Sequence, residues 1–223
     1  MGALVDLTLT LGGPRMTPVP GLPGVEFEPV HTHAQHHRSN TRVVMATHVG
    51  THVDAPYHFV PNGPTIDQVP LERCVGPGVL VDLRGRWQRR QPIGAEALAG
   101  VPAEELAGRI VLLFSGWAAS EAGGPALYTE NPHMAPELAQ ALVGAGVRAV
   151  GVDFPVDPVP EGPSGAGHFP VHRILLGAGV PIIENLVGLE ALVGRRFEVW
   201  ALPVKFYRGD GGASRVVARL LDE

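Results

Sequence analysis

Short apolar runs, separated by turn-forming residues, recur along the whole chain. Residues 4–11 alternate apolar side chains with Asp6, Thr8 and Thr10, which predicts an opening strand. Residues 12–25 are rich in proline and glycine and are predicted to form a loop. Further strands are predicted at residues 43–49, 79–83, 110–114, 147–152 and 197–206. The longest runs are almost continuously apolar, which is typical of strands buried on both faces of a sheet.

Helical patterns are fewer than strand patterns. Residues 136–145 carry proline in the first turn and glycine near the end, the usual asymmetry of a helix. A shorter helix is predicted at residues 172–176, with weak helical turns at 95–98 and 189–193. No sequence repeat and no long linker divides the chain. We therefore expect one mixed α/β domain over residues 1–223, built on a central sheet.

Composition narrows the range of partners. The 223 residues can form a domain with a sizeable core, and 45% hydrophobic against 17% charged residues excludes disorder as the main state. The net charge of -5 argues against binding to nucleic acid, which needs a basic surface. No apolar run is long enough to span a membrane. We therefore expect a small-molecule substrate rather than a nucleic acid or a membrane.

Two features of the sequence bear on the cellular compartment of the protein. The first residues lack a basic segment ahead of their apolar run, so no secretory signal is expected. Cys74 is the single cysteine, which rules out a disulfide within the chain. Both features favour a reducing compartment, and we expect a cytoplasmic protein.

Histidines are concentrated in one part of the chain. Seven of the ten lie between residues 31 and 58. Within HVGTHVDAPYHF, residues 48–59, His48, His52 and Asp54 follow the spacing His-x3-His-x-Asp, and His58 follows at the same parity. Alternate side chains of a strand share a face, but His48 and His52 would lie about 13 Å apart on a straight strand. Gly50 permits the bend that brings them together.

These side chains favour a metal site. Two imidazoles and a carboxylate suit a divalent transition metal with positions left open for water. Pro56 is expected to end strand pairing, which would place residues 57–58 on a loop.

The same segment resembles a known signature. The cyclase family, which includes kynurenine formamidases and isatin hydrolase, carries His-x-Gly-Thr-His-x-Asp-x-Pro-x-His, and every fixed position is present here. Later segments resemble the family in the same order. They are NGPTIDQVPL at 62–71, SGW at 115–117, VGVDFPVDP at 150–158, HRILLGAGVPIIENL at 172–186 and ALPVK at 201–205.

The resemblance implies a fold and a metal centre. The fold would be a swivelling β/β/α barrel-like α/β domain, assembled as a homo-oligomer, a dimer or a tetramer. The centre would hold two divalent ions per chain, zinc or manganese, although the donor set also suits iron. His48, His52 and Asp54 would bind the first metal, and His172 and Glu184 would complete the centre.

The residues themselves give these last two positions weaker support. Glu184 lies in an apolar strand opened by Pro181, where a carboxylate is costly unless it binds a metal or pairs with an arginine. His172 could instead be a surface helix residue, and His168 is a nearby competitor for the same role.

The resemblance and the chemistry together predict an amide hydrolase. A divalent metal acidifies bound water, and His58 could act as general base and then general acid, or serve as an extra ligand. The predicted reaction is hydrolysis of a small amide, formamide or cyclic amide. A cyclase, dehydratase or lyase reaction at the same metals is the alternative. A metal-binding structural protein would need every coordination position filled by protein.

The substrate pocket has three candidate residues: Val19, Phe59 and Trp117. The formamidases carry an aromatic side chain in the loop that contains Val19, so this departure argues against kynurenine formamide as substrate. Trp117 follows a buried strand and would line the pocket or belong to the core.

Two further sets of residues stay open. Asp153 and Asp157 could accept hydrogen bonds from metal-bound histidines or act as turn residues. His31, His33, His36 and His37 could line the pocket mouth, hold an adventitious metal or lie on a solvated loop.

Overall fold

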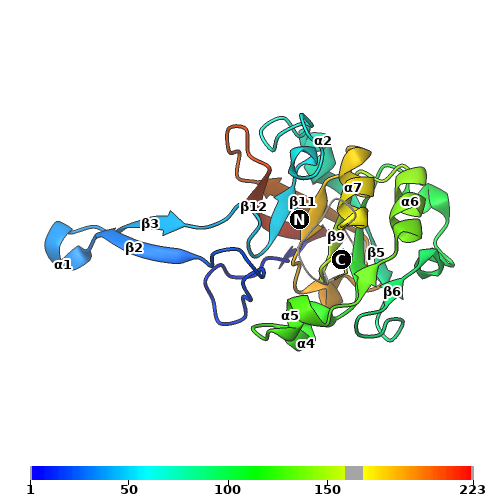
Figure 1. Ribbon diagram of the computed structural model, residues 1–223, viewed down its shortest axis with the longest axis horizontal. Helices are drawn as coiled ribbons and strands as arrows, with labels where there is room; N and C mark the ends of the chain where they lie inside the picture. Colours follow the sequence, from blue (N-terminus) through cyan, green and yellow to red (C-terminus); the bar gives the residue numbers. More distant parts are fainter. Residues whose placement is uncertain (1, 159–167, 222–223) are drawn as a thin grey trace.

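The computed structural model describes residues 2–158 and 168–221 (Figure 1). Its strands are β1 (Leu4–Asp6), β2 (Glu26–His31), β3 (Asn40–Val44), β4 (His52–Asp54), β5 (Val75–Asp82), β6 (Pro92–Ile93), β7 (Ile110–Phe114), β8 (His133–Met134), β9 (Ala149–Val152), β10 (Ile182–Glu184), β11 (Phe197–Pro203) and β12 (Gly211–Leu220). Its α-helices are α1 (His33–His36), α2 (Leu71–Cys74), α3 (Ala103–Leu106), α4 (Trp117–Glu121), α5 (Ala126–Thr129), α6 (Pro136–Gly144) and α7 (Pro170–Gly177). Short 3-10 helices are η1 (Pro56–His58), η2 (Ala95–Leu98) and η3 (Leu189–Leu192).

The main sheet closes into a barrel. Its strand order is β1-β12-β11-β5-β7-β9-β10-β4, and β4 pairs back onto β12. Seven strands therefore form a closed ring, and β1 continues along the edge of β12 beyond β4. Strands β5, β7, β9 and β10 run parallel, whereas the pairings that complete the ring are antiparallel. The barrel-like α/β fold expected from the sequence is confirmed.

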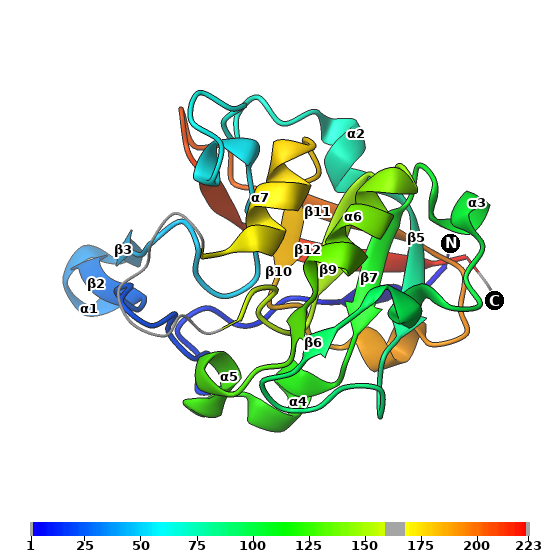
Figure 2. The same ribbon diagram turned by 45° about the vertical axis from the view of Figure 1, so that its right-hand side comes forward.

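Strand β7 explains why the barrel has two apolar layers. All five of its side chains are buried, as its continuous apolar sequence predicts. Val111 and Leu113 pack with helices α6 and α7, which lie across the strands in Figure 2. Ile110, Leu112 and Phe114 point the other way, into a second cluster. The strand alternation thus separates a helix-covered layer from the inside of the barrel.

A hairpin arm, defined as β2, α1 and β3, projects from this body (Figure 1). Every residue of β2 and β3 except His31 is exposed, and the two strands pair with each other in a sheet of their own. The proline-rich loop at 12–25 that precedes the arm has no helix or strand, as predicted. The last residues of β3 lead into the histidine segment.

Most predicted elements are present, with three corrections. The strand predicted at 43–49 is wrong in extent, because β3 ends at Val44 and residues 47–51 form a bend around Gly50, whose φ is 57°. Residues 57–58 lie in a 3-10 helix rather than a loop, because Pro56 presets the backbone of its first turn. The opening strand stops at Asp6. No helix in the described ranges is long and apolar enough to cross a membrane.

Candidate metal centre

Strand β4 carries the centre because it closes the barrel. On one side it pairs antiparallel with β10, which sets Glu184 directly opposite His52. On the other side it pairs with the first residues of β12. Because alternate residues of a strand share a face, His52 and Asp54 project together. Barrel closure therefore brings Glu184 to residues that lie far from it in the sequence.

The bend before β4 brings His48 to the same point. Gly50 takes a left-handed backbone conformation, as expected for the residue that permits the bend. The His48 ring lies over β12 at Gly211, where an added Cβ would come within 2.7 Å of the ring and 2.9 Å of the Val53 carbonyl oxygen. Nδ1 of His48 lies 2.6 Å from an oxygen of Asp54. The glycine at 211 is thus needed for the close approach of the ring to β12.

Hydrogen bonds fix how two of the imidazoles face the centre. Nδ1 of His52 donates to the Gly50 carbonyl oxygen at 2.9 Å, so Nε2 faces Asp54 at 3.1 Å and Glu184 at 3.8 Å. Nδ1 of His172 donates to Asp157 at 2.5 Å, and its Nε2 lies 3.5 Å from both Asp54 and Glu184. A histidine that donates from one nitrogen presents the other as a ligand, the usual arrangement around metals.

Asp157 also anchors the helix that carries His172. Its oxygens accept the backbone N–H groups of Val171 at 2.9 Å and of His172 at 3.1 Å, in the first turn of α7. The same carboxylate therefore holds both the helix and the imidazole ring. Of the two roles left open for this residue by the sequence, the hydrogen bond to a centre histidine is the one observed.

The electrostatics of the centre favour added positive charge. Burial lowers the pKa of His52, but the charges of Asp54 and Glu184 and its hydrogen bonds raise it to about 9. Burial likewise lowers the pKa of His172, and hydrogen bonds to Asp157, Asp54 and Glu184 raise it well above its ordinary value. Burial raises the pKa of Asp54, but the His52 charge and the polar contacts of His172, His48 and His52 hold it well below its usual range.

Asp54 is the common member of two candidate ligand sets. One set is His48, Asp54 and His58, and the other is His52, Asp54 and Glu184; within each, the ligand atoms lie within 4.8 Å of one another. Oδ2 of Asp54 is buried and accepts no hydrogen bond among the described residues, and Nε2 of His172 lies 3.5 Å from it. An unpartnered buried carboxylate oxygen between histidine nitrogens fits a divalent cation. This grouping puts His48 and His52 in different sets, whereas the resemblance assigned both to one metal.

His58 lines the pocket beside His48. Its ring stacks on that of His48, with centroids 3.7 Å apart and an interplanar angle of 21°. Burial lowers its pKa to about 4; the Asp54 charge opposes this, whereas the charges of His48 and His172 add to it. A neutral imidazole can either accept a proton or bind a metal, so both roles considered from the sequence remain compatible with its position.

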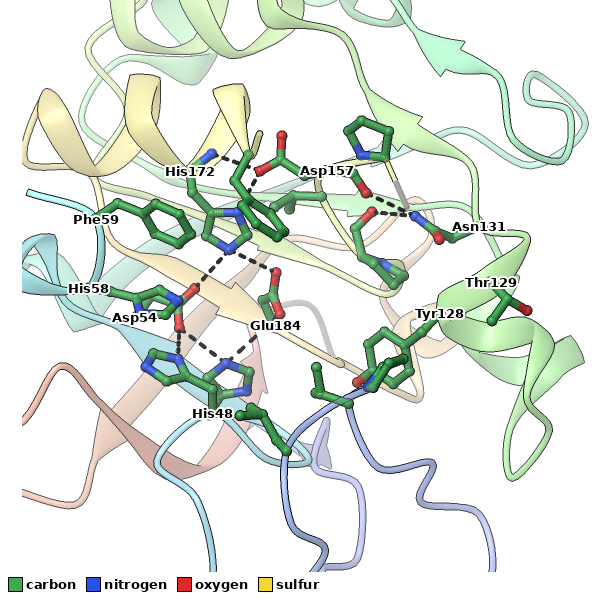
Figure 3. A pocket seen from close by; sticks show the side chains of 18 residues that line it. His48, Asp54, His58, Phe59, Tyr128, Thr129, Asn131, Asp157, His172 and Glu184 are labelled. Atoms are coloured by element: carbon green, nitrogen blue, oxygen red, sulfur yellow. Dashed lines mark hydrogen bonds and ion pairs between the residues drawn. The ribbon is translucent and has the colours of Figure 1, made fainter. Parts of the chain in front are cut away.

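A cavity of about 550 Å³ opens beside these residues (Figure 3). His48, His52, Asp54, His58, His172 and Glu184 all line it, as do the predicted pocket residues Val19 and Phe59. Trp117 does not, because its side chain is fully buried in the core and donates to the Leu127 carbonyl oxygen. His168 is also outside the lining.

The remaining histidine group lies away from the cavity. His31, His33, His36 and His37 belong to the end of the hairpin arm, and none of them lines the pocket. Their placement agrees with the expectation of a solvated segment and not with a position at the mouth of the pocket.

Two polar residues near the centre, Asp210 and Asn185, escaped the sequence reasoning. Asp210 lies 3.4 Å from Nε2 of His48 and accepts from the Thr47 hydroxyl at 2.7 Å. Asn185, at a positive φ of 58°, donates to the Gly50 carbonyl oxygen and accepts from the Tyr128 hydroxyl. The one sequence signal for Asn185 was that it directly follows Glu184, a predicted ligand. Asp210 precedes β12, a strand that the sequence reading did not identify.

Asp153 takes the other role considered for it. It accepts from the Ser115 backbone and hydroxyl and from the Gly116 backbone, at the turn before α4. Within the described ranges, its carboxylate contacts none of the histidines of the centre. It therefore stabilises a turn.

Comparisons with known proteins agree with this arrangement. The family model described as Putative cyclase matches residues 5–157. The chain is similar to a kynurenine formamidase of Salinibacter ruber, 34% identical over 176 residues that cover 78% of this chain and 77% of that protein. A second kynurenine formamidase, from Bacillus mycoides, is 31% identical over 179 residues, covering 80% and 78%.

Solved structures extend the similarity to nearly the whole chain. An isatin hydrolase bound to the product analogue thioisatinate shares the fold, with a TM-score of 0.84 at 22% identity over 99% of this chain and 92% of that one. Isatin hydrolase A from Labrenzia aggregata, bound to benzyl benzoate, superposes with a TM-score of 0.79 at 28% identity, covering 99% and 94%.

Proposed function

The chain belongs to the cyclase family, and we propose that it is a metal-dependent hydrolase that cleaves the carbon–nitrogen bond of a small amide, formamide or cyclic amide. The observation that carries this proposal is the buried group formed by Asp54, Glu184, His52 and His172, which lines a cavity. The names of the relatives support it, because kynurenine formamidases and isatin hydrolases act on such bonds.

The residues fit a pair of divalent ions, which we propose to be zinc or manganese. His48 and Asp54 would serve one ion, with His58 beside them, and His52, Asp54 and Glu184 would serve the other, with His172 facing both carboxylates of the second set. Bound divalent metal would supply an acidified water at neutral pH and polarise the substrate carbonyl group. The shared carboxylate of Asp54, with its free oxygen, supports a centre of two ions rather than one.

The chain's own residues would then orient and transfer protons. His58 reaches the cavity from η1 and could take a proton at one ring nitrogen and deliver it to the leaving nitrogen of the amide. Asp157 and the Gly50 carbonyl oxygen hold His172 and His52 in fixed tautomers. Phe59 and Val19 would exclude water from one side of the substrate.

The first test combines metal content with turnover. The purified, untagged chain is expected to bind divalent metal and to hydrolyse aryl formamides or isatin, and a chelator should abolish the activity. His52→Ala should lose metal and activity together, whereas Asp153→Asn, which alters a buried turn carboxylate away from the centre, should keep the metal. A chain that binds no metal after reconstitution would contradict the proposal.

We also propose that the chain forms a homo-oligomer and works in the cytoplasm. The hairpin arm exposes Phe27, Val30 and Val43, and an isolated two-stranded sheet is marginally stable in water unless something packs against it. A second copy is the proposed partner. Light scattering should give a mass at least twice 23.5 kDa, and a monomer at micromolar concentration would refute this part. The buried free thiol of Cys74 suits a reducing compartment.

A further inference from the structure

The cavity wall beyond the proposed ligands is almost free of charge. Its side chains come from the proline-rich loop, from the residue after η1, from α5 and the turn after it, from the loop after β9 and from the residue before α7 (Figure 3). They are Val19, Pro20, Leu22, Phe59, Tyr128, Thr129, Asn131, Pro155, Val156, Asp157, Pro158 and Phe169. None of the described lining residues is a lysine or an arginine. The one charged member, Asp157, is a carboxylate already occupied by His172 and the first turn of α7.

The side-chain donors of Tyr128, Thr129 and Asn131 are already engaged in hydrogen bonds within the protein, so they are not free to bind a ligand anion. The Tyr128 hydroxyl donates to Asn185 at 3.0 Å, and the Thr129 hydroxyl donates to the Pro125 carbonyl oxygen at 3.0 Å. The amide nitrogen of Asn131 donates to the carbonyl oxygens of Pro132, Pro155 and Asp157. Among the described side chains, a carboxylate placed in this part of the cavity would therefore find neither a cation nor a free donor.

One guanidinium group, that of Arg173, contacts a lining residue but is not itself part of the cavity lining. Arg173 lies over the Phe59 ring, 5.4 Å from its centroid, and its Nε donates to the His168 carbonyl oxygen. Residues 159–167, which fall outside the described ranges, contain no lysine or arginine in their sequence.

The wall instead offers apolar and aromatic surface. The rings of Phe59 and Phe169 lie 5.5 Å apart at an angle of 52°, and Phe59 packs against the His172 ring with centroids 4.7 Å apart. Val19 and Leu22 belong to the loop that also lines the cavity. An apolar group bound here would lie beside the centre, whereas an ionic group would lose its hydration without compensation.

We propose that the cavity selects amides whose amine portion is uncharged and largely apolar, and that it rejects substrates that carry an amino-acid group on that portion. This inference rests on the proposed hydrolase function and assigns its substrate class. In the reaction, water adds its oxygen to the acyl carbon, the carbon–nitrogen bond breaks, and a proton from the water passes to the nitrogen. For an aryl formamide the products are formate, a proton and a neutral aryl amine.

A matched pair of substrates tests the selection. N-formyl-2-aminoacetophenone and N-formylkynurenine share the formamide, the ring and the ketone, and only the second carries a carboxylate and an ammonium group. The metal-loaded chain should have a kcat/KM for the neutral compound higher by on the order of tenfold or more. Equal values, or a preference for N-formylkynurenine, would overturn the inference while leaving the hydrolase proposal intact.

Binding of the two products gives a second readout that needs no turnover. Calorimetry on the metal-loaded chain should give a Kd for 2-aminoacetophenone lower than that for kynurenine, again on the order of tenfold. If this preference holds but neither formamide is hydrolysed, the inference on the cavity stands and the hydrolase proposal fails. Equal or tighter binding of kynurenine would overturn the inference.

An introduced cation should reverse part of the preference. Leu22 lines the cavity and is 41% exposed, so Leu22→Arg can place a guanidinium group at its edge without burying it. The ratio of kcat/KM for N-formylkynurenine to that for the neutral compound should rise about tenfold, as should the corresponding ratio of product affinities. Leu71→Arg is the matched control, because Leu71 is 66% exposed and lies outside the cavity, and it should leave both ratios unchanged. An unchanged ratio in Leu22→Arg would contradict the role given to the missing cation.

Discussion

Removing the charge of Asp157 should weaken the centre through His172. Asp157→Asn keeps the size of the side chain, and its single amide oxygen can still accept one of the two backbone N–H groups of α7 that the carboxylate accepts. The substitution removes the negative charge that receives the His172 Nδ1 proton at 2.5 Å. A hydrogen bond to a charged group contributes about 1.5–3 kcal/mol, and loss of such a partner to a metal-bound histidine lowers metal affinity about 10–100-fold. The two magnitudes agree, since 1.4 kcal/mol corresponds to about tenfold.

The assay is a competition between the protein and a chelator of known affinity. Metal affinity is measured for the unaltered chain, for Asp157→Asn and for Asp153→Asn. The last is a matched control because Asp153 is also buried and also accepts backbone N–H groups, with burial raising its pKa to about 6. Both variants should lower thermal stability, but only Asp157→Asn should lower metal affinity. Equal metal affinity in Asp157→Asn and the unaltered chain, or equal losses in both variants, would refute the reasoning.

Four further outcomes are expected. His58→Ala should keep bound metal but lose about 10²–10⁴-fold in kcat if His58 transfers protons, whereas loss of metal, measured by elemental analysis, would make it a ligand. In the metal-free chain the pKa of His52 is raised to about 9, so a metal that binds His52 between about pH 6 and 8 must displace a proton. Chelator titrations should therefore show metal affinity rising about tenfold per pH unit for each proton displaced. Conversely, the stability that this proton gives the metal-free chain is fully present below about pH 6.5 and is lost as the pH rises through 9, which thermal unfolding at several pH values would detect. Gly211→Ala should displace the His48 ring and lower metal affinity, whereas Gly144→Ala, where an added Cβ meets open space, should not.

The sequence determined a large part of the framework. The apolar run at residues 110–114 is strand β7 with both faces buried, and its alternation assigns each side chain to one of two layers. The proline and glycine positions located helix α6. Such features depend on neighbouring residues alone, because strand and helix periods repeat within a few positions.

The histidine motif could also be identified from neighbouring residues alone. The spacing of His48, His52 and Asp54 around Gly50 predicted that they meet, and in the structure the bend at Gly50 brings them together. Their roles as ligands remain a prediction. The error in the strand at 43–49 arose because apolar, β-branched residues favour a strand, whereas pairing with β2 ends at Val44.

Only the tertiary structure decided which distant residues complete the centre. Glu184 faces His52 because β10 pairs with β4 in one particular register, and Asp157 reaches His172 because its loop packs beneath α7. The same closure of the barrel placed Asp210 beside His48 and left Trp117 in the core. A one-residue change of register would turn Glu184 to the other face, and the spacing within one segment carries no information about its register against another. The histidine motif is therefore a local property of the sequence. The carboxylates that face it, the cavity wall beside it and the hydrogen bonds around it are set by how the barrel closes.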